Sequence, residues 1–492
     1  MKKINPPVFY TAAGLIFALV ILSVLFTGPF EKGVTVVNDS INQYFGWFLI
    51  MSVTVFLIFS LYLLASKYGK IRLSPDDSKP KYSFISWLAM LFSAGMGIGL
   101  MFYGVAEPML HYANPPVGTG ETVAAAQTAM DFSFLHWGLH AWATYIVIGL
   151  AIAYFSYRKG YPLSIRYVFY PVFGNRVYGW VGHTIDILAV LGTLFGVATS
   201  LGLGAMQINT GLNYLTGLVQ SNTVQVIIIG IITAMAMASV ISGVDKGIKW
   251  LSTLNITLAG ILLLFIIVAG PTVFIFKSFF QNIGHFLQDF IGLSLWNQAF
   301  TGGDWQSKWS IFYWSWWIAW SPYVGIFIAR ISKGRTIREF IAGVLFVPTA
   351  FSFLWLTAFG STGIRQHLMG NATILEAVTN NMTTALFEFL QPYPLASLIS
   401  ILATLLIVTF FVTSADSGSF VIDMITSGGH ENPPLKLKVF WSTLEGVVAA
   451  VLLLGGGLLA LQTATISLGL PFAVVLLLLC YSLLKSLKAE KV

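Results

Sequence analysis

Long apolar runs alternate with short polar segments along the whole chain. Twelve of these runs are about 20 residues long, the length that an α-helix needs to cross the hydrocarbon core of a bilayer. We therefore predict an all-α polytopic membrane protein with twelve spanning helices, at residues 8–29, 45–66, 84–109, 133–156, 185–215, 223–243, 248–276, 309–332, 338–360, 394–427, 435–460 and 464–486.

The segment between the seventh and eighth runs has a different pattern. Residues 277–296 place apolar side chains on one helical face and polar side chains on the other. This pattern predicts an amphipathic helix at the outer membrane surface. It separates two blocks of five runs, which suggests inverted repeats. The expected organisation is two N-terminal helices with an inner loop, a first five-helix repeat, the interfacial helix with its loop, a second five-helix repeat and a short tail, at 1–82, 83–276, 277–307, 308–486 and 487–492.

Composition and charge support this interpretation. Hydrophobic residues make up 57% of the chain and charged residues 9%, unlike a soluble domain. If both termini are inside, all but four of the 26 Lys and Arg residues lie in the termini and the inner loops. The positive-inside rule then places both termini in the cytoplasm of a bacterial-type inner membrane. The net charge of +7 thus reports topology, and we expect no nucleic-acid partner.

Several function classes are excluded or disfavoured by what the sequence contains. The first apolar run is longer than a signal-peptide core and no small-residue cleavage site follows it, so we expect it to be retained. The single cysteine, Cys480, allows no intrachain disulfide and no cysteine-rich metal site. No phosphate-binding Gly-Lys-Ser/Thr motif occurs, and no nucleophile–base pair emerges. We therefore expect neither an ATP-driven pump nor an enzyme.

Three glycines interrupt the third apolar run. Gly95, Gly97 and Gly99 each cost about 1 kcal/mol of helix propensity relative to alanine. They predict a helix that unwinds around Met96 and Ile98. Transporters use broken helices to bind ions and substrates near the bilayer midplane. The alternative is close helix packing by small residues.

Two aromatic clusters lie within the fourth and eighth runs. Trp316 and Trp320 are one turn apart, and Trp317 lies about 100° around the helix from Trp316. The fourth run contributes Trp137, Trp142 and Tyr145. Indoles usually gather at the membrane interface, but several indoles in two helices can also enclose a quaternary ammonium ion through cation–π contacts. Both interpretations remain open at this point.

Two further motifs are weaker. Thr413 and Ser414, near the end of the tenth run, offer hydroxyl oxygens to a hard cation, although such hydroxyls more often bond their own helix backbone. His136 and His140 have the i, i+4 spacing of a zinc helix, but Trp137 stands where a metalloprotease requires glutamate. We predict no metal site from that pair.

Together these motifs resemble the betaine/carnitine/choline transporter family, and most closely its sodium-coupled glycine betaine carriers. The resemblance extends from about Phe84 to Met424 and is most specific at residues 94–108, 312–320 and 328–338. It implies five-plus-five inverted-repeat helices of the LeuT-like type behind two extra helices. It also implies a homotrimer in membrane lipid that works by alternating access.

The resemblance also implies the site residues. Trp316, Trp317 and Trp320 would form a central cage, and Trp137, Trp142 and Tyr145 would line the pathway beside it. Gly97 and Gly99 belong to the substrate-binding glycine segment. The main sodium site would use the hydroxyls of Thr413 and Ser414 and the carbonyls of Ser93, Met96 and Phe410.

Details within the family motifs refine the expected substrate. Choline carriers of the family tend to have an aspartate at the position of Gly99, whereas a zwitterion brings its own carboxylate. The carnitine-exchange branch lacks the glycine run and works without sodium. We therefore expect sodium-coupled import of glycine betaine or a related osmolyte, without a cofactor other than sodium. The alternatives are a sodium-independent or proton-coupled choline or carnitine carrier and, more remotely, a passive osmolyte channel.

Two departures from the family pattern limit this comparison. A second sodium site in the family uses two threonines of the fifth span; here Thr193 is present, but Val197 occupies the partner position. A second sodium ion is therefore in doubt. The tails at residues 1–7 and 485–492 are short and carry few lysines, which argues against a strong tail-mediated response to anionic lipid.

Overall fold

The computed structural model describes residues 4–490 apart from 96, 243 and 431. The described secondary structure is helical, and an isolated bridge joins Arg72 to Thr336. Within these ranges, ten helical segments are long and apolar enough to cross a membrane. They lie in α1 (Pro6–Leu25), α2 (Thr27–Ala65), α5 with α6 (Val123–Trp137, Leu139–Ala153), α8 (Trp180–Thr216), α9 (Asn222–Ser242), α10 (Val244–Ala269), α13 (Ile337–Leu356), α17 (Ala396–Thr426) and the two parts of α18 (Leu435–Lys488).

The remaining helices are α3 (Phe84–Gly95), α4 (Ile98–Ala113), α11 (Thr272–Leu295) and α12 (Phe312–Ile331), together with the short α7 (Tyr170–Phe173), α14 (Thr362–Leu368), α15 (Ala372–Asn380) and α16 (Ala385–Leu390). The ten candidate spans correspond to ten of the twelve predicted runs. The other two runs, 84–109 and 309–332, are α3 with α4 and α12.

The predicted break in the third run is confirmed. Helix α3 ends at Gly95 and α4 begins at Ile98, while Gly97 between them has φ −148° and ψ −145°. Met96 lies outside the described residues. Since neither half is long enough to cross a bilayer alone, this run forms a discontinuous helix.

The predicted run 133–156 lies within one candidate span, Val123–Arg158, but not within one helix. This region is divided at Gly138, where φ is −104° and ψ is −134° between α5 and α6. A Cβ at this position would lie 2.5 Å from the Phe134 carbonyl oxygen and 2.7 Å from Cε1 of Phe353. A side chain at this break would therefore clash with α13, a tertiary contact that helical periodicity does not reveal.

The last two predicted runs form one long helix, α18, with a kink. The backbone leaves helical geometry at Gly456 and Gly457, and the φ of Gly457 is +59°. This left-handed conformation favours glycine because it has no Cβ. The two runs are therefore separate segments, as predicted, and the boundary lies at Gly457.

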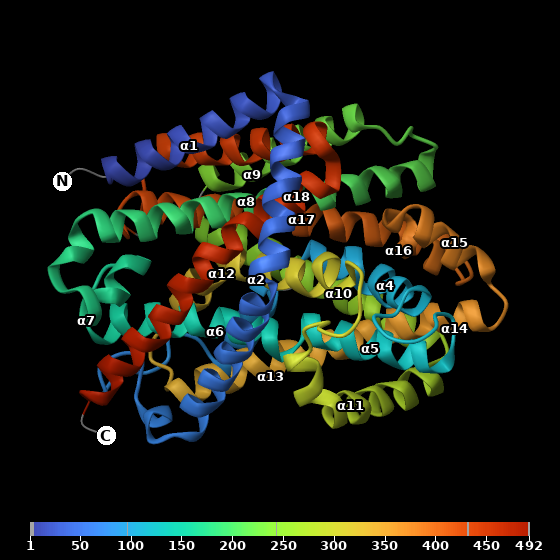
Figure 1. The fold of residues 1–492 in the computed structure, drawn as a ribbon, viewed down its shortest axis with the longest axis horizontal. Helices are drawn as coiled ribbons and strands as arrows, with labels where there is room; N and C mark the ends of the chain where they lie inside the picture. Colours follow the sequence, from blue (N-terminus) through green and yellow to red (C-terminus); the bar gives the residue numbers. More distant parts are fainter. Residues whose placement is uncertain (1–3, 96, 243, 431, 491–492) are drawn as a thin grey trace.

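The helices pack as a bundle around α8 and α12. Helix α8 contacts α17 and α18, and α12 contacts α6, α8 and α18. Figure 1 shows α12 inside the bundle, with α1 along one edge and α11 along the opposite edge. The aromatic α12 therefore lies among other helices rather than at the periphery.

Helix α11 covers most of residues 277–296, for which the sequence predicts an amphipathic helix. Phe286 on its inner face is buried and packs against Phe134 and Phe353, with ring centroids 6.0 and 5.3 Å apart. Phe280 and Ile291 are largely exposed. An exposed apolar stripe on a peripheral helix suits contact with lipid.

The loops that we expect inside the cell lie together. Arg72 donates a 2.9 Å hydrogen bond to the Gly334 carbonyl, and Arg158 forms ion pairs with Asp76 at 2.7 Å and Glu490 at 3.0 Å. The Asn5 amide donates to the Thr426 carbonyl at 2.8 Å. Both chain ends accordingly lie at the left of Figure 1.

The loops that we expect outside meet at the other end of the bundle. Trp305 donates to the Asn114 carbonyl at 3.0 Å, and His367 lies 3.3 Å from a Glu121 carboxylate oxygen. Helices α14, α15 and α16 lie at the right of Figure 1. The two sets of loops therefore lie at opposite ends of the bundle.

Candidate functional site

The six aromatic residues predicted from the fourth and eighth runs form one cluster between α5, α6 and α12. The rings of Trp316 and Trp317 stack with centroids 4.9 Å apart, and Trp137 meets Trp317 edge-on at 5.0 Å. The remaining neighbours in the cluster are Tyr145 with Trp317 at 6.3 Å, Tyr145 with Trp320 at 6.4 Å, Trp316 with Trp320 at 6.4 Å and Trp142 with Tyr145 at 5.6 Å. All six side chains are buried. Their depth in the bundle does not fit the interface interpretation of these tryptophans.

The break at Gly138 helps to fix this cluster. His136 lies in the last turn of α5, where backbone carbonyls have no partner within the helix. The indole N–H of Trp317 donates to the His136 carbonyl at 2.9 Å. An interruption in one helix thus provides the acceptor that orients an indole of another.

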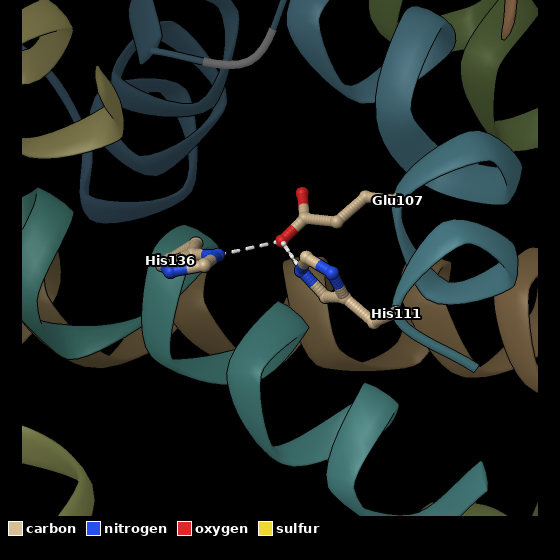
Figure 2. A group of neighbouring side chains, drawn as sticks. All are labelled: Glu107, His111 and His136. Atoms are coloured by element: carbon tan, nitrogen blue, oxygen red, sulfur yellow. Dashed lines mark hydrogen bonds and ion pairs between the residues drawn. The ribbon is translucent and has the colours of Figure 1, made fainter. Parts of the chain in front are cut away.

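Glu107 of α4, which the sequence reasoning did not identify, lies directly behind the cluster. Its Oε1 is 2.7 Å from Nδ1 of His136 and 3.2 Å from Nε2 of His111, as Figure 2 shows. Its Oε2 accepts hydrogen bonds from Trp137 Nε1 at 2.6 Å and the Tyr313 hydroxyl at 2.5 Å. The available signal was a carboxylate within an apolar run, which marks a functional residue by default.

The histidine pair of α5 and α6 does not act as a pair. His136 turns to Glu107 and, through Nε2, to the Ser310 hydroxyl at 2.9 Å. Among the described residues His140 has no hydrogen-bond partner for either ring nitrogen. Carboxylate and imidazole also ligate metals, and Glu107, His111 and His136 bring such atoms together. Because both Glu107 oxygens and both His136 nitrogens are hydrogen-bonded in full burial, we interpret the group as a hydrogen-bond centre.

The glycines at the helix break contact both predicted sites. A Cβ on Gly99 would lie 2.6 Å from Cη2 of Trp137 and 3.4 Å from Cη2 of Trp316. Among the described atoms, a Cβ on Gly97 would have the Ser414 hydroxyl as its one neighbour within 4 Å, at 3.8 Å. The missing side chain at position 99 therefore lets two indoles close against the helix break, and position 97 faces α17.

The residues predicted to bind sodium lie on α17 beside this break. Phe410, Thr413 and Ser414 are buried, and their i, i+3, i+4 spacing places them on one face of the helix. Thr413 Oγ1 donates to the Thr409 carbonyl at 2.8 Å and accepts from Asn255 Nδ2 at 3.0 Å. The hydroxyl has a second lone pair that a cation could use. Phe410 also shares a small apolar pocket with Gly97.

The other predicted sodium ligands are less completely described. Ser93 lies in α3, and its side chain is outside the described part of the chain, as is the whole of Met96. On α8, the hydroxyl of Thr193 is buried without a partner in the described residues. Val197 packs against α17 at Gly418 and offers no oxygen.

Comparison with known proteins identifies the family. A family model described as BCCT, the betaine/carnitine/choline family transporters, matches residues 7–492. The glycine betaine transporter OpuD of Bacillus subtilis is 46% identical over 497 residues, covering all of this chain and 96% of the relative. A glycine betaine transporter of Acinetobacter baylyi is 46% identical over 99% of this chain and 74% of the relative. The high-affinity choline transport protein of Escherichia coli is 41% identical over 99% of this chain and 73% of the relative.

These matches cover nearly the whole chain at identities well above those of a distant likeness, and the relatives are transporters rather than enzymes. The helical bundle with its apolar spans agrees with an integral membrane protein. The chain belongs to the betaine/carnitine/choline family of membrane transporters.

Proposed function

We propose that this transporter imports glycine betaine or a closely related compatible solute together with sodium, by alternating access. It works in the inner membrane with both termini in the cytoplasm. Twelve helices span the bilayer when the discontinuous α3–α4 and α12 join the ten candidate spans. Residues 83–276 and 308–486 form the inverted repeats, and three copies of the chain assemble into a homotrimer.

The observation that carries this proposal is the buried aromatic cluster, which contains hydrogen-bond donors without a partner among the described residues. Indole faces attract a quaternary ammonium ion, and each contributes about 0.5–2 kcal/mol when water is excluded. Within the described residues, the indole N–H groups of Trp316 and Trp320 and the hydroxyl of Tyr145 are buried without a partner. Buried polar groups normally have one. A ligand with both a trimethylammonium group and a carboxylate would use the faces and the donors.

The same reasoning supports a zwitterion over choline. Choline brings a cation without a carboxylate and needs a counter-charge, for which family members offer an aspartate at the position of Gly99. Here Gly99 has no room for a side chain, because Trp137 occupies the space. The relatives named for glycine betaine transport are consistent with this preference.

Sodium coupling has separate support from α17. The Ser414 hydroxyl lies next to Gly97 in the broken helix, Thr413 precedes it on α17, and the freed backbone carbonyls of a broken helix are the other ligands that a hard cation takes. Because Val197 offers no oxygen ligand at the second sodium site of the family, we expect one sodium ion per transport cycle rather than two. The membrane potential does no work on a zwitterion by itself, so a co-transported cation is what makes accumulation possible.

The test is uptake of radiolabelled glycine betaine by proteoliposomes that contain the purified protein. We expect uptake with an inward sodium gradient, little uptake when potassium replaces sodium, and stronger competition by unlabelled glycine betaine than by choline. Uptake that is indifferent to sodium while the proton gradient is collapsed would overturn the coupling. Stronger competition by choline would overturn the substrate preference.

A further inference from the structure

We propose that Glu107 is a positioning and specificity-determining residue of the aromatic cage, acting as the buried anion that favours a cationic head group. This inference rests on the proposed function and identifies the part of the ligand that the site recognises by charge. It assigns a role to a residue outside the predicted cage.

The contacts of Glu107 join three segments of the chain. One carboxylate oxygen faces His111 of α4 and His136 of α5, and the other faces Trp137 of α5 and Tyr313 of α12. Figure 2 shows the carboxylate between the two imidazoles. A single side chain of α4 therefore contacts α5 and α12, two of the three helices that form the cage.

The hydrogen-bond inventory indicates that Oε2 of Glu107 carries no proton. An indole N–H can only donate, so Trp137 at 2.6 Å requires an acceptor. The Tyr313 hydroxyl at 2.5 Å donates to the same atom. A proton on Oε2 would oppose both donors, and Oε1 already faces two imidazoles. The arrangement fits an ionised carboxylate, for which hydrogen bonds are stronger than for a neutral acceptor.

This anion lies directly behind two rings of the cluster. The Trp137 and Tyr313 rings are 5.4 Å apart, and each contacts Trp317, at 5.0 and 5.7 Å. An N–H or O–H that donates to a carboxylate polarises its own ring, because hydrogen bonds in a low-dielectric interior reinforce one another. More electron density on the ring faces strengthens their attraction for a cation. The fully buried charge of Glu107 also attracts that cation directly.

A purely structural role for Glu107 predicts something different. If the carboxylate only holds the rings in place, its loss lowers the affinity for every ligand that fits the cage. If it also provides charge, its loss lowers the affinity for a ligand with a cationic head group more than the affinity for a ligand whose head group has the same shape but no charge. Glycine betaine has such an isostere in 3,3-dimethylbutanoate, in which a tert-butyl group replaces trimethylammonium and the carboxylate is retained.

The experiment compares the binding of both compounds to purified, monodisperse protein through the fluorescence of the cage tryptophans. For Glu107→Gln we expect the affinity for glycine betaine to fall about tenfold or more, while that for 3,3-dimethylbutanoate changes less than about threefold. Glu107→Asp keeps the charge and displaces it, so the affinities for both ligands should fall together. Glu445→Gln is the matched control: Glu445 is a buried carboxylate on α18 that accepts from Ser419 at 2.6 Å, and its loss should leave the ratio of the two affinities unchanged.

A second variant keeps the test valid if Glu107→Gln does not fold. His111→Phe keeps a ring against Trp309, which lies 4.5 Å away, and removes one of the two imidazoles that contact the carboxylate. The preference for glycine betaine over the isostere should then stay the same or increase, and a decrease would contradict the proposal.

The possible outcomes separate the two levels of the account. A wild-type protein that binds neither compound would overturn the proposed function and this inference with it. A wild-type protein that binds glycine betaine, together with a Glu107→Gln variant that loses affinity for both compounds by the same factor, would overturn this inference alone.

Discussion

Substitution of Gly99 by alanine should disrupt the cage, although it adds only one methyl group. The new Cβ would lie 2.6 Å from Cη2 and 3.0 Å from Cζ3 of Trp137, whereas carbon atoms in contact are normally about 3.5–4.0 Å apart. The indole would have to move by about 1 Å. It cannot do so freely, because its N–H is bound to Glu107 and its ring abuts Trp317.

The size of the effect follows from the cost of overpacking. Such insertions cost about 1–3 kcal/mol, which corresponds to roughly 5- to 150-fold in affinity if the strain is relieved by displacing the cage. Gly97→Ala is the matched control, because a Cβ there meets no described atom closer than the Ser414 hydroxyl at 3.8 Å. We expect Gly97→Ala to retain glycine betaine affinity within about threefold.

The assay is equilibrium binding of glycine betaine to Gly99→Ala, Gly99→Asn, Gly99→Asp and Gly97→Ala. All three variants at position 99 share the steric penalty, and Gly99→Asp alone adds a charge. A shift of preference toward choline in Gly99→Asp but not in Gly99→Asn would assign specificity to charge. Wild-type affinity in Gly99→Ala, or equal damage from Gly97→Ala, would refute the steric argument.

Three further predictions concern other parts of the molecule. Trp317→Leu and Trp320→Leu should each reduce glycine betaine affinity in a binding assay, since an aliphatic side chain provides no cation–π attraction. Losing both indoles should cost about 1–4 kcal/mol of binding free energy. Unchanged affinity in both variants would remove the cage from the mechanism. Replacing Thr413 and Ser414 with alanine should raise the sodium concentration needed for half-maximal uptake. In the wild type, the dependence of uptake on sodium concentration should have a Hill slope near one. A slope near two would mean that Val197 does not prevent a second sodium site. The hydrogen bond from Arg158 lowers the pKa of Glu490 from 4.5 to about 2, so Glu490 should stabilise the fold fully above about pH 4.5 and lose this effect as the pH falls toward 2. The difference in Tm between wild type and Glu490→Gln should therefore be constant at pH 6–8 and shrink in acid, and a difference that grows in acid would contradict this assignment.

Local sequence patterns were sufficient for most of the helices. Apolar length located the spans, and the propensity cost of Gly95, Gly97 and Gly99 located the break between α3 and α4, because both effects act within a single segment. The break at Gly138 was missed because the contact that excludes a side chain there includes Phe353 of another helix. A single glycine in a run gives no comparable local signal.

In the candidate site, too, residues with a local sequence signal were predicted and residues joined only by tertiary packing were missed. The cage residues were chosen from their types and spacing together with a family resemblance, and the structure brings all six together. The Glu107 centre was missed because its members come from three segments, at Glu107, at His136 with Trp137, and at Tyr313. The zinc-helix pattern compares His136 only with its neighbours on one helix. The carboxylate partner of His136, Glu107, lies 29 residues earlier in the chain. Such pairings arise from tertiary packing.

The central claim, sodium-driven accumulation of a zwitterion, is tested most directly by the steady-state ratio of glycine betaine inside and outside proteoliposomes. With about 100 mV across the membrane, one sodium ion contributes roughly 2.3 kcal/mol, and a tenfold sodium gradient adds about 1.4 kcal/mol. One sodium per substrate therefore predicts accumulation of a few hundredfold, and two would predict about 10⁵-fold. A ratio of a few hundred that collapses when the sodium gradient and the potential are dissipated is the expected result. A ratio that stays at one under the full gradient would contradict coupled transport.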